Sequence, residues 1–245
     1  MSNIYLEPIE HVYIDSDTKE RYKSVTTVLS LLEEEFPADD IALAIANQDI
    51  SKKKEKYHNM SQEVILESWE RENKVANDYG TMVHNLLEDY IKKNRFYFPT
   101  DQNHKNILNA FDELDIDFGE KVHCERIMYS KKHKIAGTSD LIIDVNHNTF
   151  DVLDHKTNKT FNFYSLYEKK LLPPLTHLDD CQYNIYALQL SIYAYMYENE
   201  TRKNCRRLMI NYFDKENCKF TIYPVPYMKM EAESVLNFYH DNYIL

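Results

Sequence analysis

Two aspartates and a lysine occupy the ends of two short apolar segments. Asp140 opens the segment DLIIDV, and Asp154 and Lys156 lie at the end of the segment FDVLDHK. The polar residues 146–149 between them are typical of a turn, so the pattern predicts a β-hairpin. Antiparallel pairing would bring Asp140 and Asp154 side by side at the end away from the turn. Asp154 and Lys156 should leave the same face, because side chains alternate along a strand.

This cluster predicts a site for a hard divalent cation. Two carboxylates beside an ammonium are costly to assemble without a cation, and oxygen ligands suit Mg²⁺ or Mn²⁺. The triplet itself carries little weight, because Asp17, Glu72 and Glu168 begin other acid-x-lysine triplets. What distinguishes Asp154 is its place at the end of an apolar strand. A hairpin with a salt bridge at its rim is the structural alternative.

Four motifs in chain order resemble a known nuclease family. They are G-T-M-V-H ending at His84, G-T-S-D-L-I around Asp140, V-L-D-H-K-T around Asp154, and Q-L-S-I-Y from Gln189 to Tyr193. Together they resemble the PD-(D/E)XK nuclease superfamily, specifically its RecB-like exonuclease branch. Within that branch the sequence is similar to phage exonucleases and to the mitochondrial genome maintenance exonuclease.

The resemblance implies a set of metal ligands. These are His84, Asp140, Asp154 and the backbone carbonyl of His155, which would hold one or two ions of Mg²⁺ or Mn²⁺. Imidazole among carboxylates favours tolerance of Mn²⁺.

Glu125 matches an acidic position that the branch carries on the strand beside the hairpin. It would bind or orient a second metal. A structural salt bridge to Arg126 or Lys131 is the equal alternative.

The resemblance also implies catalytic and DNA-contacting roles. Lys156 would help deprotonate the attacking water or stabilise the negative charge that develops on the phosphate. Lys159 would hold a flanking phosphate, and Thr157 would help to fix the strand end. Ser24 and Thr26 would touch the DNA backbone, although Ser24 also fits a plain helix N-cap.

Gln189 and Tyr193 match the glutamine–tyrosine pair that faces the active site in the branch. Gln182 and Tyr186 have the same spacing on the same helix, so the register stays open. The aromatic residues of the segment 160–180 suit either stacking on single-stranded bases or packing on the core.

Periodicity predicts the elements around these motifs. Trp69, Val75 and Ala76 share a helical spacing and are expected in the core. Helices are predicted at residues 62–78, 81–92, 103–114, 182–198 and 228–239, and strands at residues 122–129, 207–213 and 219–225.

Composition sets the outer bounds. The chain has 245 residues, of which 43% are hydrophobic and 28% charged, as in a globular protein. Its net charge of −11 argues against broad contact with nucleic acid, although a local basic channel can coexist with an acidic exterior.

The four cysteines show no C-x-x-C spacing, so we expect no zinc site. The C-terminal cysteine run that holds an iron–sulfur cluster in some relatives is absent, so we expect no such cluster. With no signal peptide or membrane-length apolar run, we expect a cytoplasmic protein without a membrane partner, in the host cytoplasm if it is phage-encoded.

The expected fold is α/β (mixed α+β), a restriction-endonuclease-like core with a central mixed sheet flanked by helices. We expect one nuclease domain over residues 1–245, with a helical elaboration at about residues 24–95. The resemblance implies a Mg²⁺- or Mn²⁺-dependent exonuclease that hydrolyses linear DNA at its ends and prefers single strands. A structure-specific endonuclease and a non-cutting DNA- or partner-binding protein on the same fold are the alternatives.

Overall fold

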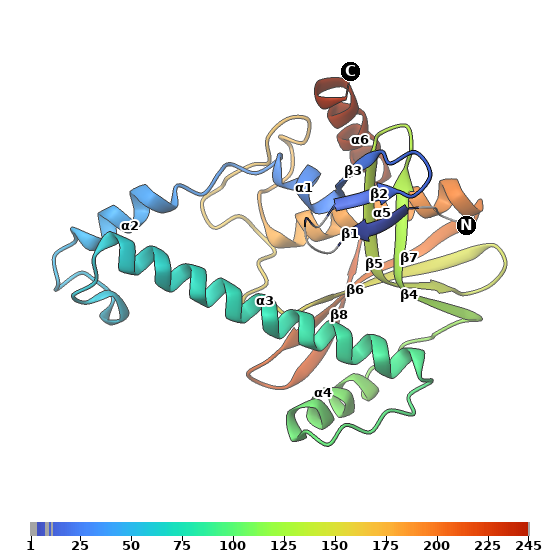
Figure 1. Cartoon of the computed structure of the whole chain (residues 1–245), viewed down its shortest axis with the longest axis horizontal. Coiled ribbons are helices and arrows are strands. Elements are labelled where there is room, and N and C mark those ends of the chain that lie inside the picture. Colours follow the sequence, from blue (N-terminus) through green and yellow to red (C-terminus); the bar gives the residue numbers. More distant parts are fainter. Residues whose placement is uncertain (1–3, 8–9, 11, 245) are drawn as a thin grey trace. The chain divides into compact units, whose positions relative to one another are not determined.

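The chain divides into two compact units. The computed structural model describes residues 4–7, 10 and 12–244 (Figure 1). The larger unit comprises Met1–Glu33 and Val83–Leu245, and the smaller unit comprises Glu34–Met82. All of the predicted site residues belong to the larger unit. The single nuclease domain therefore stays a prediction, and each unit is described by itself.

Within the described residues, an eight-stranded mixed sheet forms the centre of the larger unit. Its order is β1-β2-β3-β5-β6-β7-β8, and β4 pairs with β5 outside this path. The pairs β3–β5 and β6–β7 are parallel, whereas β4–β5, β5–β6 and β7–β8 are antiparallel. The strands are β1 (Ile4–Glu7), β2 (Val12–Asp15), β3 (Arg21–Ser24), β4 (Lys121–Ser130), β5 (Ile135–Asp144), β6 (Thr149–Lys156), β7 (Asn204–Asp214) and β8 (Lys219–Val225).

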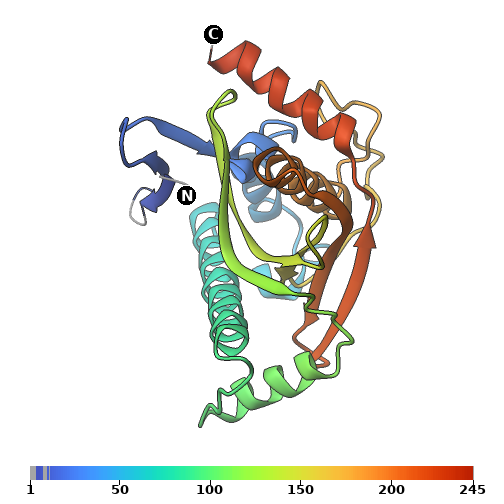
Figure 2. The ribbon, with the colours of Figure 1, turned by 90° about the vertical axis from the view of Figure 1, so that its right-hand side faces the viewer.

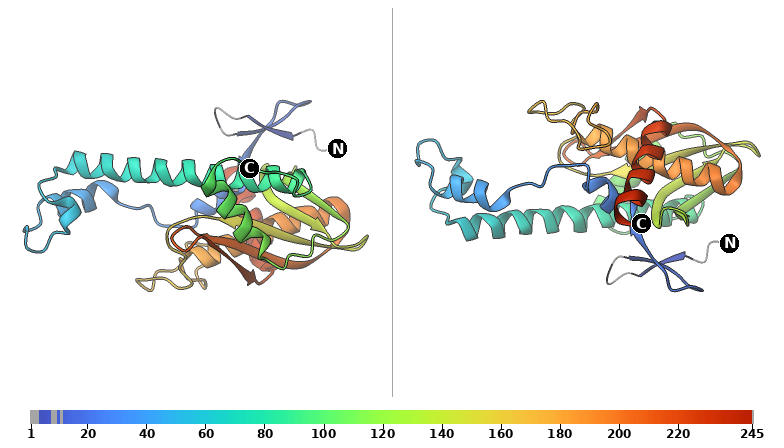
Figure 3. Two further views of the ribbon diagram at one scale, coloured as in Figure 1. Left: turned by 90° about the horizontal axis from the view of Figure 1, so that it is seen from below. Right: turned by 90° about the horizontal axis from the view of Figure 1, so that it is seen from above.

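Helices flank this sheet, which confirms the expected mixed α/β architecture. They are α1 (Val25–Ser30), α4 (Gln102–Asp112), α5 (Gln182–Thr201) and α6 (Lys229–Tyr243). The helix α5 packs on the sheet, and α6 packs on α5 (Figure 3). Both sides of α5 are buried, since Ala187, Leu188, Leu190 and Ile192 are all inaccessible to solvent. Even polar side chains of α5 are therefore held in the core.

The helix α4 packs on the opposite face of the sheet. Its Phe111 contacts Phe220 of β8 and His155 of β6, with ring centroids 5.6 and 6.0 Å apart. His155 leaves the sheet on the face opposite to its neighbours Asp154 and Lys156, because side chains alternate along β6. The two faces of β6 thus meet different helices.

The predicted hairpin is confirmed as the pair β5–β6. Its register runs from Asp144 opposite Phe150 to Leu141 opposite Leu153. Asp140 is therefore the first residue beyond the paired stretch, where the two strands separate. Figure 2 shows β4 and β5 as a long, curved antiparallel pair beside this point.

One prediction about the helices is wrong, because the two helices expected between residues 62 and 92 are one. The helix α3 (Gln62–Lys92) has 31 residues and continues through Gly80. An interior glycine costs about 1 kcal/mol relative to alanine. Apolar side chains after it, such as Val83 and Leu87, are fully buried and offset that cost.

The smaller unit holds α2 (Ala38–Ala46), a 3₁₀ turn (Glu55–Tyr57) and the first part of α3. Trp69 packs there between two rings, and its indole nitrogen donates to the Tyr57 hydroxyl at 2.9 Å. Val75, however, is 60% exposed, and Ala76 is exposed as well, so their predicted place in a core is wrong. The small apolar cluster of this unit, around Ala42, Tyr57 and Ile65, does not extend as far along α3 as Val75 and Ala76.

Candidate metal centre

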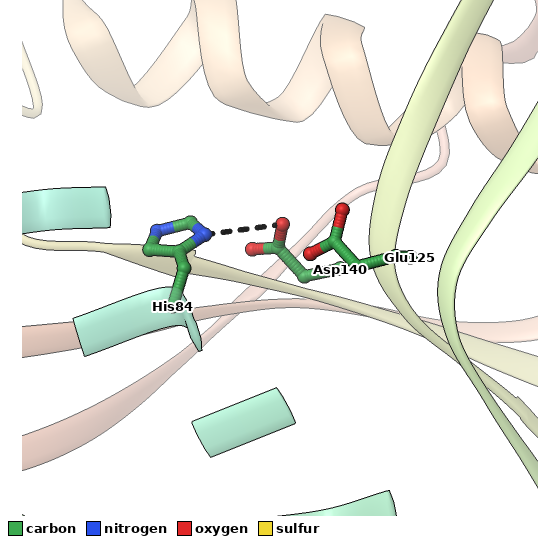
Figure 4. A group of neighbouring side chains, drawn as sticks. All are labelled: His84, Glu125 and Asp140. Carbon is green, nitrogen blue, oxygen red and sulfur yellow. Dashed lines mark ion pairs between the residues drawn. The ribbon is translucent and has the colours of Figure 1, made fainter. Parts of the chain in front are cut away.

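Three side chains from separate elements converge in the larger unit. His84 comes from α3, Glu125 from β4 and Asp140 from β5 (Figure 4). One ligand atom of each lies within 4.8 Å of the others. The Nδ1 atom of His84 is 3.3 Å from Oδ1 of Asp140. This group matches the size of a site for one divalent cation.

Glu125 reaches the group by way of an unusual backbone conformation. The β4–β5 register pairs Cys124 with Leu141 and Arg126 with Ser139, which places Glu125 opposite Asp140. Its φ angle is +49°, in the left-handed region that a residue with a Cβ atom enters at a cost of about 1–2 kcal/mol. Such strain concentrates at functional sites.

Neither Arg126 nor Lys131 forms a salt bridge with Glu125 among the described residues. Arg126 pairs instead with Glu200 on α5. Lys131 lies over the ring of Tyr129, with its Nζ 6.0 Å from the ring centroid. Glu125 instead lies near Asp140 and His84.

The protonation states of the group differ. Burial alone would raise the pKa of Asp140, but the adjacent His84 outweighs it, and the pKa falls. Burial lowers the pKa of His84, whereas the charge of Asp140 and its hydrogen bond raise it by more. Desolvation of the Glu125 carboxyl, followed by the charges of Asp140 and Glu88, raises its pKa to about 7.

Asp154 and Lys156 form a buried ion pair beside this group. The Oδ2 atom of Asp154 is 2.5 Å from the Nζ atom of Lys156, and Asp154 is 2% exposed. That same oxygen has no hydrogen bond of normal geometry within the described residues. Burial raises the pKa of Asp154, and the charge of Asp140 adds to this effect. A buried carboxylate that one ammonium contacts keeps lone pairs that a cation can take.

The side chain of Lys156 is fixed by the polar stripe of α5. Its Nζ atom donates to Oε1 of Gln189 at 3.1 Å, and Nε2 of Gln189 donates to the Tyr193 hydroxyl at 3.0 Å. The same ammonium lies 4.5 Å from the centroid of the Tyr186 ring. Gln189 and Tyr193 therefore lie at Lys156, and Tyr186 also takes part. Gln182 turns elsewhere, to the backbone N–H of Asn162.

His155 contributes its backbone to the site. Its N–H donates to Oδ2 of Asp140 at 2.6 Å. Its side chain accepts from Nδ2 of Asn211 at 2.9 Å on the other face of the sheet, and burial lowers the pKa of the ring to about 4. The backbone carbonyl of His155 as a metal ligand stays a prediction. Sequence reasoning missed Asn211, because an asparagine within a strand carries no signal of its partner.

The remaining predicted residues lie around this centre with mixed outcomes. Ser24 is confirmed as the N-cap of α1, and its Oγ atom accepts from the Thr27 N–H at 3.0 Å. The Thr26 hydroxyl bonds to the Ser24 hydroxyl at 2.9 Å and is exposed. Lys159 is exposed, and Thr157 is partly buried. The DNA contacts of these four residues stay predictions.

The donor set fits a hard divalent cation. It combines the imidazole of His84 with the carboxylates of Glu125 and Asp140, and the Asp154 carboxylate lies beside this group. Such a set suits Mg²⁺ or Mn²⁺. The thiols of Cys124, Cys181, Cys205 and Cys218 are free and are not part of this group.

The comparisons with known proteins show no family for this chain. No protein-family model matches the sequence, and no curated protein matches it. Among solved structures, the "Putative exonuclease" from Eubacterium rectale is 13% identical with a TM-score of 0.40, and the match covers 90% of this chain and 78% of that chain. The structure of SSO0001 is 14% identical with a TM-score of 0.33, and the match covers 88% of this chain and 82% of that chain. Neither likeness is strong enough to carry an argument.

Across residues 4–7, 10 and 12–244, no helix combines the length and the apolar character that crossing a membrane requires.

Proposed function

We propose that the protein is a Mg²⁺- or Mn²⁺-dependent deoxyribonuclease of the RecB-like branch of the PD-(D/E)XK superfamily. It would act as an exonuclease on the ends of linear DNA and prefer single strands. The observation that carries the proposal is the convergence of His84, Glu125 and Asp140 within 4.8 Å, beside the buried Asp154–Lys156 pair.

The metal, held by His84, Glu125, Asp140 and Asp154, would supply positive charge to the scissile phosphate and acidity to a water molecule. The protein side chains position the remaining charges. Lys156 contacts the side chains of Asp154 and Gln189. Burial alone would lower the pKa of the Lys156 ammonium, but the charge of Asp154 opposes this and the pKa is raised. Lys156 therefore acts as an ammonium that stabilises the negative charge developing on the phosphate. This favours charge stabilisation over the alternative role in deprotonating water.

The preference for single strands rests on the aromatic segment next to Lys156. Phe161 lies parallel to Tyr186, at 6.0 Å and 6° between their rings, and Tyr186 lies against Lys156. Further along, Tyr164 and Tyr167 are 77% and 80% exposed. Exposed rings that lead away from a metal centre can stack unpaired bases, whereas paired bases present no free face to them.

The test is a time course on end-labelled single-stranded DNA, duplex DNA and a closed circle, with Mg²⁺, Mn²⁺ or EDTA. We expect metal-dependent shortening of the linear single strand, slower loss of the duplex and an intact circle. The matched control is Asp241→Asn, which changes an exposed aspartate near the end of α6, while Asp154→Asn should abolish cutting. Cutting of the circle would instead establish an endonuclease. Tight DNA binding without any cutting would establish a non-cutting protein.

A further inference from the structure

A cavity of about 580 Å³ lies in the larger unit next to the candidate metal centre. One wall is the C-terminal end of α3 with the turn that follows it, and the other is the start of β4 with the residues before it. The volume falls in the range of small-molecule sites, about 300–1,000 Å³. The roles proposed for the metal centre do not use this cavity.

Three cations line the cavity. They are Lys92, Arg95 and Lys121, and one acid, Glu120, lies among them. Lys92 pairs with Glu88, and Arg95 lies 3.6 Å from Asp112. An anionic ligand could exchange these carboxylate contacts for its own and would meet Lys121 directly.

Lys121 is the cation most available to such a ligand. It is an exposed residue, and among the described residues no ion pair or hydrogen bond engages its side chain. It pairs through its backbone with Asp144 at the first position of the β4–β5 ladder, so its Cα atom is fixed while its ammonium is free.

The cavity also has a firm apolar part. The Phe118 ring lines it and carries the Arg95 guanidinium 4.7 Å from its centroid. The next residue, Gly119, has a φ angle of +58°, and a Cβ atom there would lie 2.5 Å from the backbone oxygen of Asp144. Only glycine fits, so the chain before β4 lies tightly against the end of β5. A ring and a planar cation in one wall suit a nucleobase, and the lysines suit its phosphate.

The cavity lies close enough to the metal centre for one DNA strand to reach both. Cys124 lines it and immediately precedes Glu125 of the metal centre. Lys92 follows His84 by two turns of α3, a separation of about 12 Å along the helix axis. At the duplex rise of about 3.4 Å per nucleotide this separation would span three or four nucleotides, and an extended single strand would span it with fewer.

We propose that this cavity binds a phosphorylated nucleotide, the one a few positions from the scissile phosphate on the strand held at the metal centre. The inference rests on the proposed nuclease function for the identity of the strand. The binding itself needs only the cavity. Lys92 and Lys121 hold the phosphate, and the wall of Phe118 and Arg95 holds the base.

The test is titration of deoxyadenosine monophosphate into the metal-free protein in EDTA, followed by calorimetry and by NMR. Deoxyadenosine and inorganic phosphate are titrated in parallel. We expect the nucleotide to bind at least about tenfold more tightly than either part alone, because a charge-assisted hydrogen bond and a stacked base each contribute about that factor. Lys121→Gln and Arg95→Gln should each weaken nucleotide binding about tenfold. The matched control Lys219→Gln, an exposed lysine outside the cavity, should not.

Two results would overturn the inference. The first is that Lys121→Gln and Arg95→Gln leave the affinity for the nucleotide unchanged. The second is that inorganic phosphate binds as tightly as the nucleotide. Because EDTA removes the metal, the outcome is independent of cutting. Nucleotide binding that depends on Lys121, in a protein that cuts no DNA, would refute the nuclease proposal and support the cavity. DNA cutting without such binding would refute the cavity alone.

Discussion

Gly137 offers the sharpest test of how the core supports the site. A Cβ atom at this position would lie 2.6 Å from Cε1 of Tyr193 and 3.0 Å from Cγ2 of Val25. Tyr193 is 2% exposed and cannot swing into solvent, and it accepts the hydrogen bond that orients Gln189 toward Lys156. Gly137→Ala must therefore displace a buried ring that is one step from the site lysine.

The expected cost is that of overpacking a core, about 1–3 kcal/mol of unfolding free energy. For a chain of this size each kcal/mol shifts the midpoint by about 2–4 °C, so Tm should fall by about 2–12 °C. The assay is thermal unfolding by calorimetry in EDTA, together with DNA cutting at a temperature where the variant is folded. Cutting should also slow, because Gln189 and Lys156 shift with Tyr193.

The matched control is Gly80→Ala, the same substitution at the glycine that opens the other G-T motif. Gly80 lies inside the helix α3, so alanine there should raise the unfolding free energy, by about 0.5–1 kcal/mol. Tyr193→Leu should partly restore the stability lost in Gly137→Ala, since it removes the atom that the new Cβ meets. Equal Tm values for Gly137→Ala and the wild type would refute the packing argument.

Three further predictions concern the site itself. Because the pKa of Glu125 is about 7, its carboxyl is protonated below that pH, and Mg²⁺ must displace the proton. The affinity for Mg²⁺ should therefore fall as the pH drops through 7 and become constant above it. Calorimetry of Mg²⁺ binding in buffers of different ionisation enthalpy should show that binding releases a proton, and this release should be absent in Glu125→Gln. Glu125→Gly should raise the unfolding free energy of the metal-free protein by about 1 kcal/mol, because glycine adopts φ +49° without strain, yet it should weaken Mg²⁺ binding; a lower Tm in EDTA would contradict this. Lys156→Gln should slow cutting by about 10²–10³-fold with DNA affinity nearly unchanged, as gel shift in Ca²⁺ would measure, and a rate within a few-fold of wild type would exclude the proposed charge stabilisation.

The sequence predicts most of the elements, because their signals are local. Alternation and turn residues predict the β5–β6 hairpin, and the pair Asp140 and Asp154 follows from its register. Gly80 was the misleading signal: a glycine after Asp78 resembles a helix end, but burial of the following apolar turn keeps α3 continuous.

From spacing alone the site could be predicted only as far as the β5–β6 hairpin, and His84 and Glu125 were predicted from the family resemblance. Three of its features depend on contacts between elements that sequence spacing does not show. They are the left-handed backbone of Glu125, the Asn211 side chain behind His155, and the Tyr186 ring beneath Lys156. The choice between the two glutamine–tyrosine pairs also needed the packing of α5 on the sheet, which brings Gln189 to Lys156.

The most direct test of the central claim is to locate the metal. A crystal of the wild-type protein with Mn²⁺ and a short single-stranded oligonucleotide should show one or two anomalous peaks about 2 Å from donor atoms of His84, Glu125, Asp140 and Asp154, with a phosphate beside Lys156. Anomalous density elsewhere on the protein, with these four side chains unliganded at saturating Mn²⁺, would contradict the account.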